Sequence, residues 1–365
     1  MPYIERIKIQ HLRNITDASL ELSPSVNIFF GKNGSGKTSF LEAISLLGLG
    51  RSFRTHQSRN TIQHEYEKLT VFGELNTQSA DKTSLGIQKD KQGRTHLKIN
   101  GSNAHSSSAL AKNLPLQLIN NQSFQLLEGS SRQRRHFLDW MVFHVKHDFI
   151  QAWTSLQKVI KNRNSILRRG RIDESELLPW DTEFLRLANI LHAFRDEVFQ
   201  EFKVNLNHLD ADFAATQSLD IDYYCGWNSE KALKQILAET FSKDRQVGYT
   251  HYGPHRADLK IKVSNKKAVD VLSRGQEKSL ICGLHIGQAG YYQLKLNKKC
   301  VFLIDDMLSE LDIDHQQQLA NWLLTLNGQA FITGVDKEEL LNIWSKVDTN
   351  IAMFHVEHGQ ISKVY

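Results

Sequence analysis

The sequence predicts an α/β fold in which a mixed sheet with flanking helices is joined to a mainly helical second lobe. Short β-like runs separated by turns fill roughly the first 110 residues. From about Phe137 the chain changes to long stretches with helical apolar spacing, interrupted by a polar break near Asp173 to Pro179. After Asp220 short strands return, and the C-terminal end alternates strands and helices in the manner of βαβ units.

The predicted lobes follow these changes in pattern. We expect residues 1–115 and 246–365 to form the sheet-containing lobe and residues 116–245 to form the helical lobe. The helical stretches lack a sustained a/d heptad pattern, so they are not expected to form long coiled-coil arms.

The composition is that of an ordinary globular protein, with 40% hydrophobic and 23% charged residues among 365. No segment approaches the ~20 apolar residues of a membrane span, and the N-terminus lacks a secretory signal, so we expect a cytoplasmic protein without a membrane partner. The three scattered cysteines are expected to be buried thiols. A net charge of +5 permits a nucleic-acid partner, and arginines gather near residues 51–54, 132–135 and 163–171. For each cluster a solvated surface is an equally good interpretation.

A phosphate-binding loop is the strongest local signal. The pattern Gly-x-x-x-x-Gly-Lys-Thr at 31–38 directly follows an apolar strand and precedes a helix that we expect to be amphipathic. Glycines let the backbone close around an anion, Lys37 neutralises the β- and γ-phosphate oxygens during catalysis, and Thr38 offers its hydroxyl to Mg²⁺. ATP and Mg²⁺ are therefore the expected cofactors. The residues predicted to bind the nucleotide here are Gly31, Lys32, Asn33, Gly34, Ser35, Gly36, Lys37, Thr38 and Ser39.

Two acidic residues are expected to meet this loop from a second strand. The apolar run from Cys300 to Ile304 suits a buried parallel strand, and Asp305 and Asp306 at its C-terminal end would lie beside the phosphates. Asp305 is predicted to act on the metal, directly or through water, and Asp306 to orient the attacking water.

A capped helix start completes a set of motifs. In LSRGQ at 272–276, Ser273 is the predicted N-cap, and the next residues lie in the first turn, where backbone N–H groups are unpaired. Followed by the acid-tipped strand and then by SELD at 309–312, this stretch resembles the motif set of ABC ATPases. That resemblance implies that the signature residues bind ATP held by a second copy in a homodimer, with Asp312 in the D-loop at the interface. The signature residues are Ser273, Arg274, Gly275 and Gln276.

Over its whole length the chain resembles the RecF family of the SMC-like branch of these ATPases. The stretches that carry the resemblance, besides the P-loop, LSRGQ and LIDDMLSELD, are HLRNI at 11–15, GRSFRT at 50–55, SRQRRHFLDW at 131–140 and THYGPHRAD at 250–258. It implies an ABC-type ATPase head that binds DNA in recombinational repair and replication restart. The implied partners are duplex DNA near gaps or junctions, single-stranded DNA, RecR, and downstream RecO and RecA.

The resemblance also implies roles for single residues outside these loops. Gln122, in the Q-loop region of the helical lobe, would sense Mg²⁺ and take part in catalysis. Arg13 and Asn14 would approach the nucleotide, and Arg54 would reach the ATP phosphates. A β-turn that packs the first strand is the alternative for Arg13 and Asn14, and structural ion pairing is the alternative for Arg54.

Two positions depart from the pattern of transporter ATPases. Thr333 stands where transporters carry a switch histidine, and a hydroxyl cannot become cationic, so γ-phosphate sensing should be weaker. Asp306 stands where a glutamate is common, and its shorter side chain should lie further from the attacking water. We therefore predict slow hydrolysis, and the family resemblance implies a weak, DNA-stimulated ATPase that serves as a switch. An ABC transporter ATPase subunit is the alternative, but the wide separation of Lys37 and Ser273 argues against it.

The THYGPHRAD stretch contains two histidines four residues apart, a spacing that can bind a metal on a helix. Gly253-Pro254 prevents the helix that would place His251 and His255 on one face, so metal ligation is not expected. Arg256 and Asp258 are expected either to pair locally or to touch DNA. The same two possibilities hold for Arg134, Arg135 and Asp139.

Overall fold

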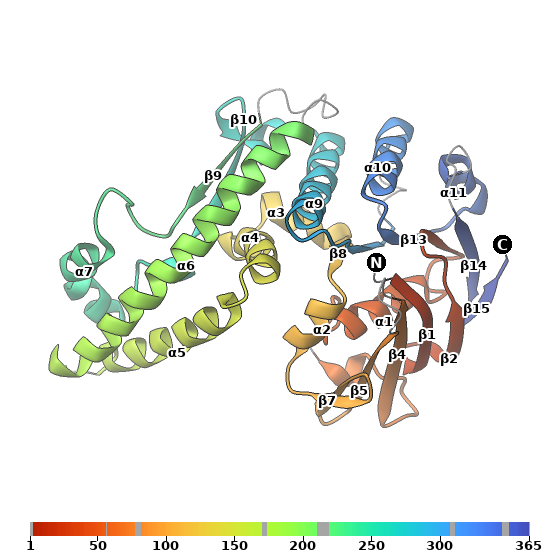
Figure 1. Cartoon of the computed structure of the whole chain (residues 1–365), viewed down its shortest axis with the longest axis horizontal. Helices are drawn as coiled ribbons and strands as arrows, with labels where there is room; N and C mark the ends of the chain where they lie inside the picture. The colour runs from red at the N-terminus through yellow and green to blue at the C-terminus, as the bar shows by residue number, and fades with distance from the viewer. Residues whose placement is uncertain are drawn as a thin grey trace. The chain divides into compact units, whose positions relative to one another are not determined.

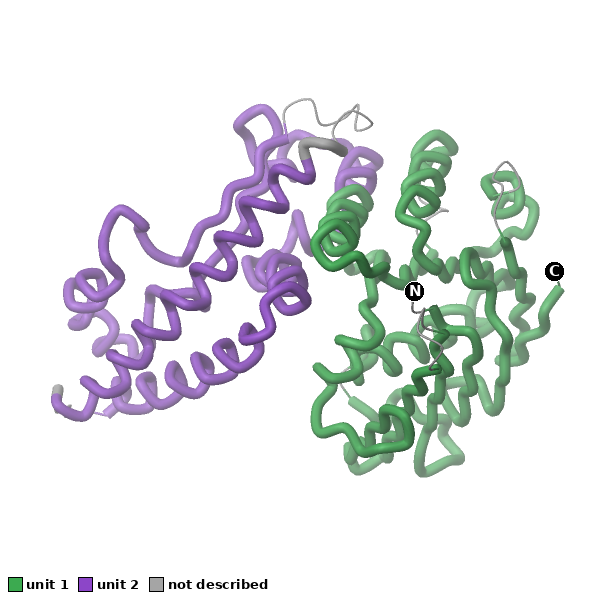
Figure 2. Tube along the Cα trace, viewed as in Figure 1, with its two compact units in different colours: residues 1–123, 282–365 green, residues 124–281 purple. Residues whose placement is uncertain are grey.

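A computed structural model describes residues 3–55, 57–76, 82–169, 174–209, 219–306, 311–344 and 350–364. The chain divides into two compact units, unit 1 with Met1–Ser123 and Cys282–Tyr365, and unit 2 with Phe124–Ile281 (Figure 2). The first division lies close to the expected boundary after residue 115. The second differs, because residues 246–281 fall in unit 2, where β10 (Asp258–Val263) pairs along its whole length with β9 (Leu219–Tyr224).

Unit 1 contains an antiparallel sheet in the strand order β2-β1-β4-β5-β6-β7. Alternate residues along β4 are buried, as expected for strands with one face toward the core. The strands are β1 (Tyr3–Leu12), β2 (Ile15–Glu21), β4 (Lys68–Asn76), β5 (Thr83–Asp90), β6 (Thr95–Ile99) and β7 (Ser102–Ala104).

The second sheet of unit 1 has the order β15-β14-β3-β13-β12-β8, and its strands run parallel except for β15. All residues of β12 and β13 are buried, which explains why these two strands are mostly apolar runs. Because β3, β13 and β12 are parallel neighbours, their carboxyl ends meet at one edge. The strands are β3 (Val26–Phe30), β8 (Leu116–Ile119), β12 (Val301–Ile304), β13 (Gln329–Gly334), β14 (Ile351–Glu357) and β15 (Gln360–Lys363).

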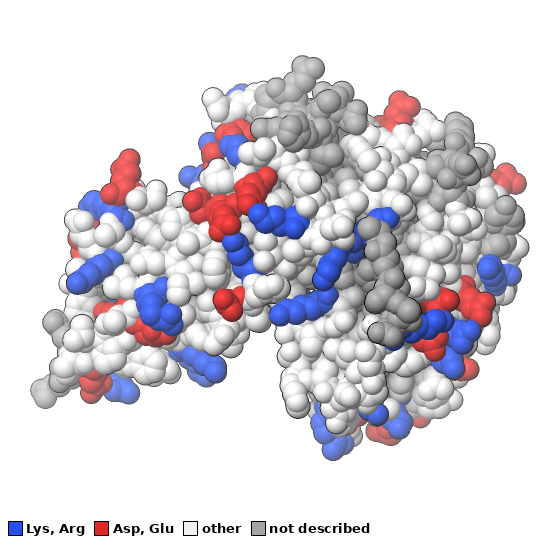
Figure 3. All heavy atoms as spheres, in the orientation of Figure 1, with Lys and Arg blue, Asp and Glu red and all other residues white. Residues whose placement is uncertain are grey.

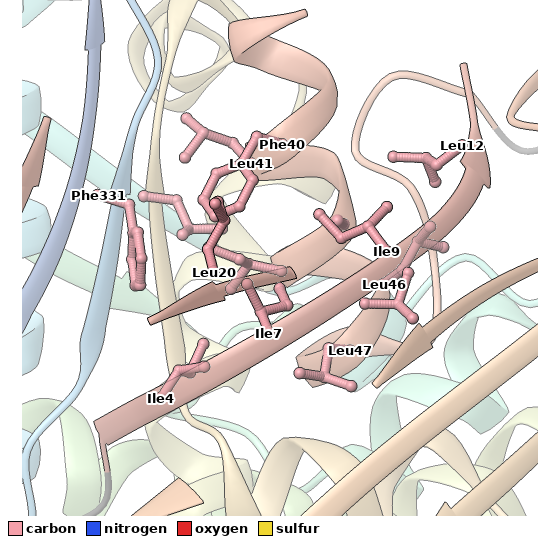
Figure 4. Close-up of a cluster of buried hydrophobic side chains, with 14 of the residues drawn as sticks. Ile4, Ile7, Ile9, Leu12, Leu20, Phe40, Leu41, Leu46, Leu47 and Phe331 are labelled. Carbon is pink, nitrogen blue, oxygen red and sulfur yellow. The ribbon is translucent and has the colours of Figure 1, made fainter. Parts of the chain in front are cut away.

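Helix α1 (Lys37–Leu49) packs in a core that contains residues of both sheets. Figure 4 shows Leu41, Leu46 and Leu47 of α1 beside β1 and β13. Every residue of α1 from Ser39 to Gly48 is buried, so the expected amphipathic helix is instead buried on all sides. Gly73 in β4 permits this close packing, since a Cβ there would lie 2.4 Å from the Leu47 side chain.

The remaining helices of unit 1 lie around these sheets (Figure 1). Helix α9 crosses the division between the units after Ile281. The three cysteines of the chain are buried, as predicted. The helices are α2 (Ser107–Asn113), α9 (Arg274–Leu296), α10 (Ile313–Leu326) and α11 (Lys337–Trp344), with short 3-10 turns at Ser58–Asn60 and Asn121–Phe124.

Unit 2 is mainly helical, with a small sheet of β9, β10 and β11 (Lys266–Lys267). Helices α5 (Phe149–Leu167) and α6 (Glu174–Leu209) lie side by side (Figure 1). The break expected near Asp173 to Pro179 is absent over residues 174–179, because α6 begins at Glu174 and includes Pro179, while Asp173 lies outside the described residues. Its other helices are α3 (Gln125–Glu128), α4 (Ser131–Val145), α7 (Leu233–Val247), the 3-10 turn Pro254–Arg256 and α8 (Ala268–Val271).

The predicted α/β class with a mainly helical second part is confirmed. Among the described helices α6 is the longest, with 36 residues, and it packs against α5 within unit 2 instead of extending as a coiled-coil arm. None of the described helices has both the length and the apolar character needed to cross a membrane.

Candidate nucleotide-binding site

The loop that joins β3 to α1 closes around the Lys37 ammonium group. Lys37 Nζ donates hydrogen bonds to the carbonyl oxygens of Gly31 (2.6 Å) and Lys32 (3.1 Å). Gly31 and Gly34 have φ values of 151° and 79°, in the region that favours glycine. A Cβ at Gly31 would also lie 2.2 Å from the carbonyl oxygen of Val356. The glycines of the motif are therefore required by the shape of the loop.

The loop offers unused hydrogen-bonding capacity to an anion. Ser35 Oγ is buried and forms no hydrogen bond within the part of the chain that is described. A Cβ added at Gly34 would meet no atom within 4 Å, so this side of the loop faces open space. Together with the N-terminus of the long helix α1, these groups fit the phosphates of a nucleotide.

Two acids and two threonines meet at the carboxyl ends of the neighbouring strands. Asp305 Oδ1 accepts hydrogen bonds from Thr38 Oγ1 (3.0 Å) and Thr333 Oγ1 (2.9 Å). Thr333 Oγ1 in turn accepts a hydrogen bond from the backbone N–H of Asp306 (2.9 Å). The structure therefore brings the P-loop threonine and Asp305 together, as oxygen donors that could hold Mg²⁺.

The charged groups of this site are partly buried from water, and burial shifts their pKa values. Burial raises the pKa of Asp305, hydrogen bonds from Thr333 and Thr38 oppose the rise, and the nearby Asp306 adds to it. Burial lowers the pKa of Lys37, against the attraction of Asp306 and Asp305. A cation beside Asp305 would stabilise its ionised form.

Asp306 has an unusual backbone conformation. Its φ is 56°, in the left-handed region that non-glycine residues rarely occupy. The hydrogen bond from its N–H to Thr333 holds the backbone in this conformation. Strain of this kind is common at functional sites, where it fixes the direction of a side chain.

Thr333 has a role that the sequence analysis missed. We considered it only as a weak replacement for a switch histidine, whereas its buried hydroxyl links the two acids. A hydroxyl residue at the end of a buried strand that runs parallel to the acid-tipped strand was the available signal.

Glu42 is a second missed residue. It is fully buried on α1, and its two carboxylate oxygens accept hydrogen bonds from Arg13, each at 2.9 Å. Ser52 also donates to it, and the Arg54 guanidinium lies 3.8 Å away. Both arginines that were expected near the nucleotide thus pair with Glu42. An acid within the otherwise apolar run FLEAISLL was its signal in the sequence.

Asn14 contacts the P-loop directly. Its Nδ2 donates to the carbonyl oxygen of Ser35 (2.8 Å), and its Oδ1 accepts from Ser39 Oγ (3.2 Å). A Cβ at Gly36 would lie 3.0 Å from Asn14 Nδ2. The turn that contains Asn14 therefore supports the loop from outside.

Gln122 and Asp312 are placed by local contacts. Gln122 is exposed, and its backbone N–H donates to Asn120 Oδ1 (2.9 Å). Among the described residues no hydrogen bond joins Gln122 to Thr38 or Asp305. Asp312 is the N-cap of α10 and accepts from the His315 backbone N–H (3.0 Å). Ser309 and Glu310 of the predicted D-loop lie outside the described residues.

The signature residues begin α9 in unit 2. Ser273 Oγ accepts from the Gln276 N–H (3.4 Å), and Gln276 Oε1 accepts from the Ser273 N–H (2.9 Å), which is a reciprocal cap. This cap satisfies one N–H group that we expected to be unpaired. A Cβ at Gly275 would meet no atom within 4 Å. Arg274 is exposed and pairs with Glu128 and Glu277. The start of the helix therefore presents an open surface.

The stretch at 250–258 is held by internal contacts of unit 2. Arg134 forms two hydrogen bonds with Asp258 (2.7 and 3.1 Å), and Arg135 donates to the Ala257 carbonyl (2.7 Å). Asp139 accepts two hydrogen bonds from Arg195 (2.7 and 2.9 Å), which also donates to the carbonyl oxygen of residue 254. These residues were expected either to pair locally or to touch DNA, and the structure contains the local pairs.

Both histidines of that stretch have protein partners. His251 Nδ1 lies 2.8 Å from Asp244, and His255 Nε2 lies 2.9 Å from the carbonyl oxygen of Thr250. Arg256 lies over the Tyr249 ring, 5.4 Å from its centre. Within the described ranges, no group of three or more His, Cys, Asp or Glu residues is arranged to hold a metal ion.

Comparison with known proteins identifies the family. Residues 3–362 match the family described as RecF/RecN/SMC N terminal domain. The chain is 44% identical over 360 residues to the DNA replication and repair protein RecF of Cellvibrio japonicus, covering 98% of this chain and 99% of that protein. It is 42% identical to the protein of the same name from Pseudomonas aeruginosa strain LESB58, covering 99% of this chain and 97% of that one.

Solved structures agree on the fold. A structure titled as the recombination mediator protein RecF-ATP in the RecFOR pathway superposes with a TM-score of 0.88 at 23% identity, covering 100% of this chain and 98% of that chain. An Smc head domain with an extended coiled coil, from Pyrococcus furiosus, superposes with a TM-score of 0.60 at 14% identity, covering 100% and 96%. The fold is thus that of an ABC-type ATPase head of the SMC class. The transporter alternative is not favoured, and the chain belongs to the RecF family, within the group described as RecF/RecN/SMC.

Proposed function

We propose that this chain is an ATP-dependent DNA-binding protein of recombinational repair and replication restart, with a weak, DNA-stimulated ATPase that serves as a switch. The single observation that carries the ATP-dependent part is the meeting of the P-loop with Asp305, Asp306 and Thr333. The names of the curated relatives, which are DNA replication and repair proteins, support the DNA part.

In this proposal the chain's own residues divide the work at the nucleotide. The P-loop N–H groups and Lys37 bind the phosphates, while Thr38 and Asp305, together with Gln122, hold Mg²⁺. When bound, Mg²⁺ supplies positive charge to the phosphate oxygens. Asp306 orients the attacking water, from the backbone position that Thr333 holds. Its short side chain keeps hydrolysis slow.

We further propose that ATP closes a homodimer on DNA and that hydrolysis reopens it. The open surface at Ser273 to Gln276, in which Gly275 has no near neighbour, supports binding to ATP held by a second copy. Duplex DNA near gaps and single-stranded DNA are the proposed nucleic-acid partners. The RecFOR pathway named for a structural neighbour supports RecR and RecO as protein partners, with RecA loaded downstream.

Light scattering with and without ATP and Mg²⁺, combined with binding to a labelled gapped duplex, tests this function. We expect ATP to double the molar mass of the wild type and DNA binding to follow the dimer. Ser273→Arg should stay monomeric, whereas Ser229→Arg, which adds the same charge at another exposed position of unit 2, should behave as the wild type. A Ser273→Arg variant that dimerises normally would exclude a role of this helix at the interface.

A further inference from the structure

We propose that unit 2 carries a binding site for the phosphodiester backbone of nucleic acid, formed by Arg168, Arg169 and Arg245. This inference rests on the proposed DNA binding and assigns part of it to a place. The three arginines line one hollow of about 620 Å³ between the C-terminal ends of α5 and α7, which we call the arginine hollow. Ser242 and Gln246 add polar groups to its wall.

The charge in the arginine hollow is of one sign. None of the described residues that line it is acidic. Arg168 and Arg245 are exposed, and neither forms an ion pair with any described residue. Arg169 pairs with Glu176 (2.7 Å), but both side chains are at least half exposed, and exposed pairs of this kind contribute little stability. Within the described part of unit 2, Arg168 and Arg245 are thus available to an anionic ligand, and the exposed Arg169 can exchange Glu176 for one.

The backbone beneath the arginine hollow is held rigidly. Arg163 of α5 and Asp244 of α7 form a fully buried ion pair (2.9 Å), and Asn164 Oδ1 accepts a hydrogen bond from the Thr250 N–H (2.9 Å). Arg163 lies less than two turns before Arg168, and Asp244 directly precedes Arg245. The ends of the two helices are thus fixed to each other, which reduces the loss of conformational freedom when a ligand binds.

Gly248 fixes the stem of one arginine. Its φ of 74° is in the left-handed region, where it ends α7. A Cβ at this position would lie only 2.7 Å from Arg168 Cγ. The Arg168 side chain therefore packs closely over the glycine, which limits the directions that its guanidinium group can take.

A phosphodiester is favoured over an acidic protein segment by the shape and chemistry of the site. Guanidinium groups bind phosphate through two parallel hydrogen bonds, and three of them here lie along one broad hollow. On the face drawn in Figure 3, basic side chains of unit 2 are interspersed with acidic ones. Arg168 and Arg245 form no ion pair with any described residue, and cations of this kind contact phosphate oxygens when a protein recognises a nucleic-acid backbone.

The salt dependence of DNA binding tests this site. We would compare the wild type with Arg168→Gln/Arg245→Gln, with Arg168→Lys/Arg245→Lys, and with the control Arg186→Gln/Lys231→Gln. The control removes two cations of unit 2 that already pair with Glu183 and Glu239. For the glutamine pair in the hollow, we expect the slope of log Kd against log salt concentration to become shallower by about 2, with affinity lower by on the order of tenfold or more. The control and the lysine pair should keep the wild-type slope.

The possible results distinguish a failure of the arginine hollow from a failure of the proposed DNA binding. If the glutamine pair and the control lose DNA affinity equally, the effect is one of overall charge and the site is rejected. Unchanged DNA affinity with lost binding of a polyglutamate peptide would assign the arginine hollow to a protein partner instead, which also rejects it. If the wild type itself does not bind DNA, the proposed function fails together with the site. Equal binding of a fluorescent ATP analogue by all variants shows that they are folded.

Discussion

Single hydroxyl groups organise the acids of the nucleotide site. Asp305 Oδ1 accepts from both Thr38 and Thr333, and hydrogen bonds to a charged acceptor are stronger than those between neutral groups. Thr333 also accepts from the Asp306 N–H. One side chain therefore positions both the Asp305 carboxylate, which we expect to bind the metal, and the backbone of Asp306, which we expect to orient the attacking water. The geometry that we propose for hydrolysis therefore depends on a residue that carries no charge.

Replacing Thr333 by valine should uncouple binding from hydrolysis. The change keeps the shape but removes the hydroxyl, which leaves the Asp306 N–H without its partner and releases the left-handed backbone at that residue. We expect kcat for ATP hydrolysis to fall about tenfold or more, because small displacements of a water-orienting group are costly, while ATP affinity changes less than about threefold. Thr333→Ser, which keeps the hydroxyl, is the control. A wild-type kcat in the valine variant would contradict the positioning role.

Asp305→Asn should stabilise the protein in the absence of nucleotide. Burial raises the pKa of Asp305 in the folded chain, so ionisation at neutral pH favours the unfolded chain. This cost is absent below the ordinary aspartate pKa, grows as the pH rises toward the raised value, and is complete above it. We expect the variant to be more stable than the wild type in urea unfolding at pH 7 and the gain to vanish as the pH falls. A gain that does not depend on pH would point to another cause.

At the scale of elements, α1 joins the P-loop to the rest of unit 1. It brings Lys37 and Thr38 to the site at its start, and its buried Glu42 binds the β1–β2 turn through Arg13 and the following loop through Ser52. A buried carboxylate without such partners would be strongly unfavourable, so these contacts fix the two segments to the helix.

Glu42→Gln should weaken this junction. The variant retains the size of the side chain but leaves the part-buried Arg13 without its anion, and we expect unit 1 to lose about 2 kcal/mol of unfolding free energy. Chemical denaturation would measure the loss. Glu74→Gln, which disrupts the looser and more exposed contact with Arg6 at 3.9 Å, should cost less than about 0.5 kcal/mol. Equal losses in the two variants would show that the buried Glu42 pair stabilises unit 1 no more than an exposed ion pair does.

The stretch at 250–258 should make the stability of unit 2 sensitive to acid. Burial lowers the pKa of His255 to about 4, while its ring donates to the Thr250 carbonyl. Because the unfolded chain takes up this proton near pH 6.5 and the folded chain does not, stability falls as the pH drops from about 6.5 to 4, by about 3 kcal/mol in total. His255→Gln should remove this component from the pH profile. His96→Gln, which changes an exposed histidine of unit 1, should leave it in place.

At the scale of the whole molecule, the motifs lie on different units. The P-loop and both acids belong to unit 1, whereas Ser273 to Gln276 belong to unit 2, at the start of a helix that continues into unit 1. A homodimer in which each signature helix completes the partner's nucleotide site would couple ATP binding to the joining of two copies.

Mixing two inactive variants tests this composite site. Lys37→Ala lacks a working P-loop and Ser273→Arg lacks a working signature helix, so each alone should hydrolyse almost no ATP. In a mixed dimer one of the two sites has both working parts, so an equal mixture should recover ATP hydrolysis that neither variant shows alone. Two preparations of the same variant, mixed as a control, should recover none. Absence of recovery in the mixed sample, with mixed dimers detected, would show that each site is completed within one chain.

The sequence alone determined those features that are encoded in contiguous residues. The P-loop required glycines at positions with positive φ, the apolar run before Asp305 required a strand buried on both faces, and Ser273 was recognisable as the N-cap of the helix that follows it. The family could be recognised because these motifs occur in a fixed order. Local backbone sterics and local hydrogen bonds decide each of them, so a short stretch contains all the necessary information.

The tertiary structure decided which distant residues meet. Thr333 lies 28 residues from Asp305, Arg13 lies 29 from Glu42, and Arg134 lies 124 from Asp258. The pairing of β10 with β9 likewise moved residues 246–281 into unit 2. No periodicity records such contacts, because the chain brings them together only when sheets and helices pack and each buried charge must find a partner. The motifs therefore identified the chemistry, while packing selected the side chains that hold it in place.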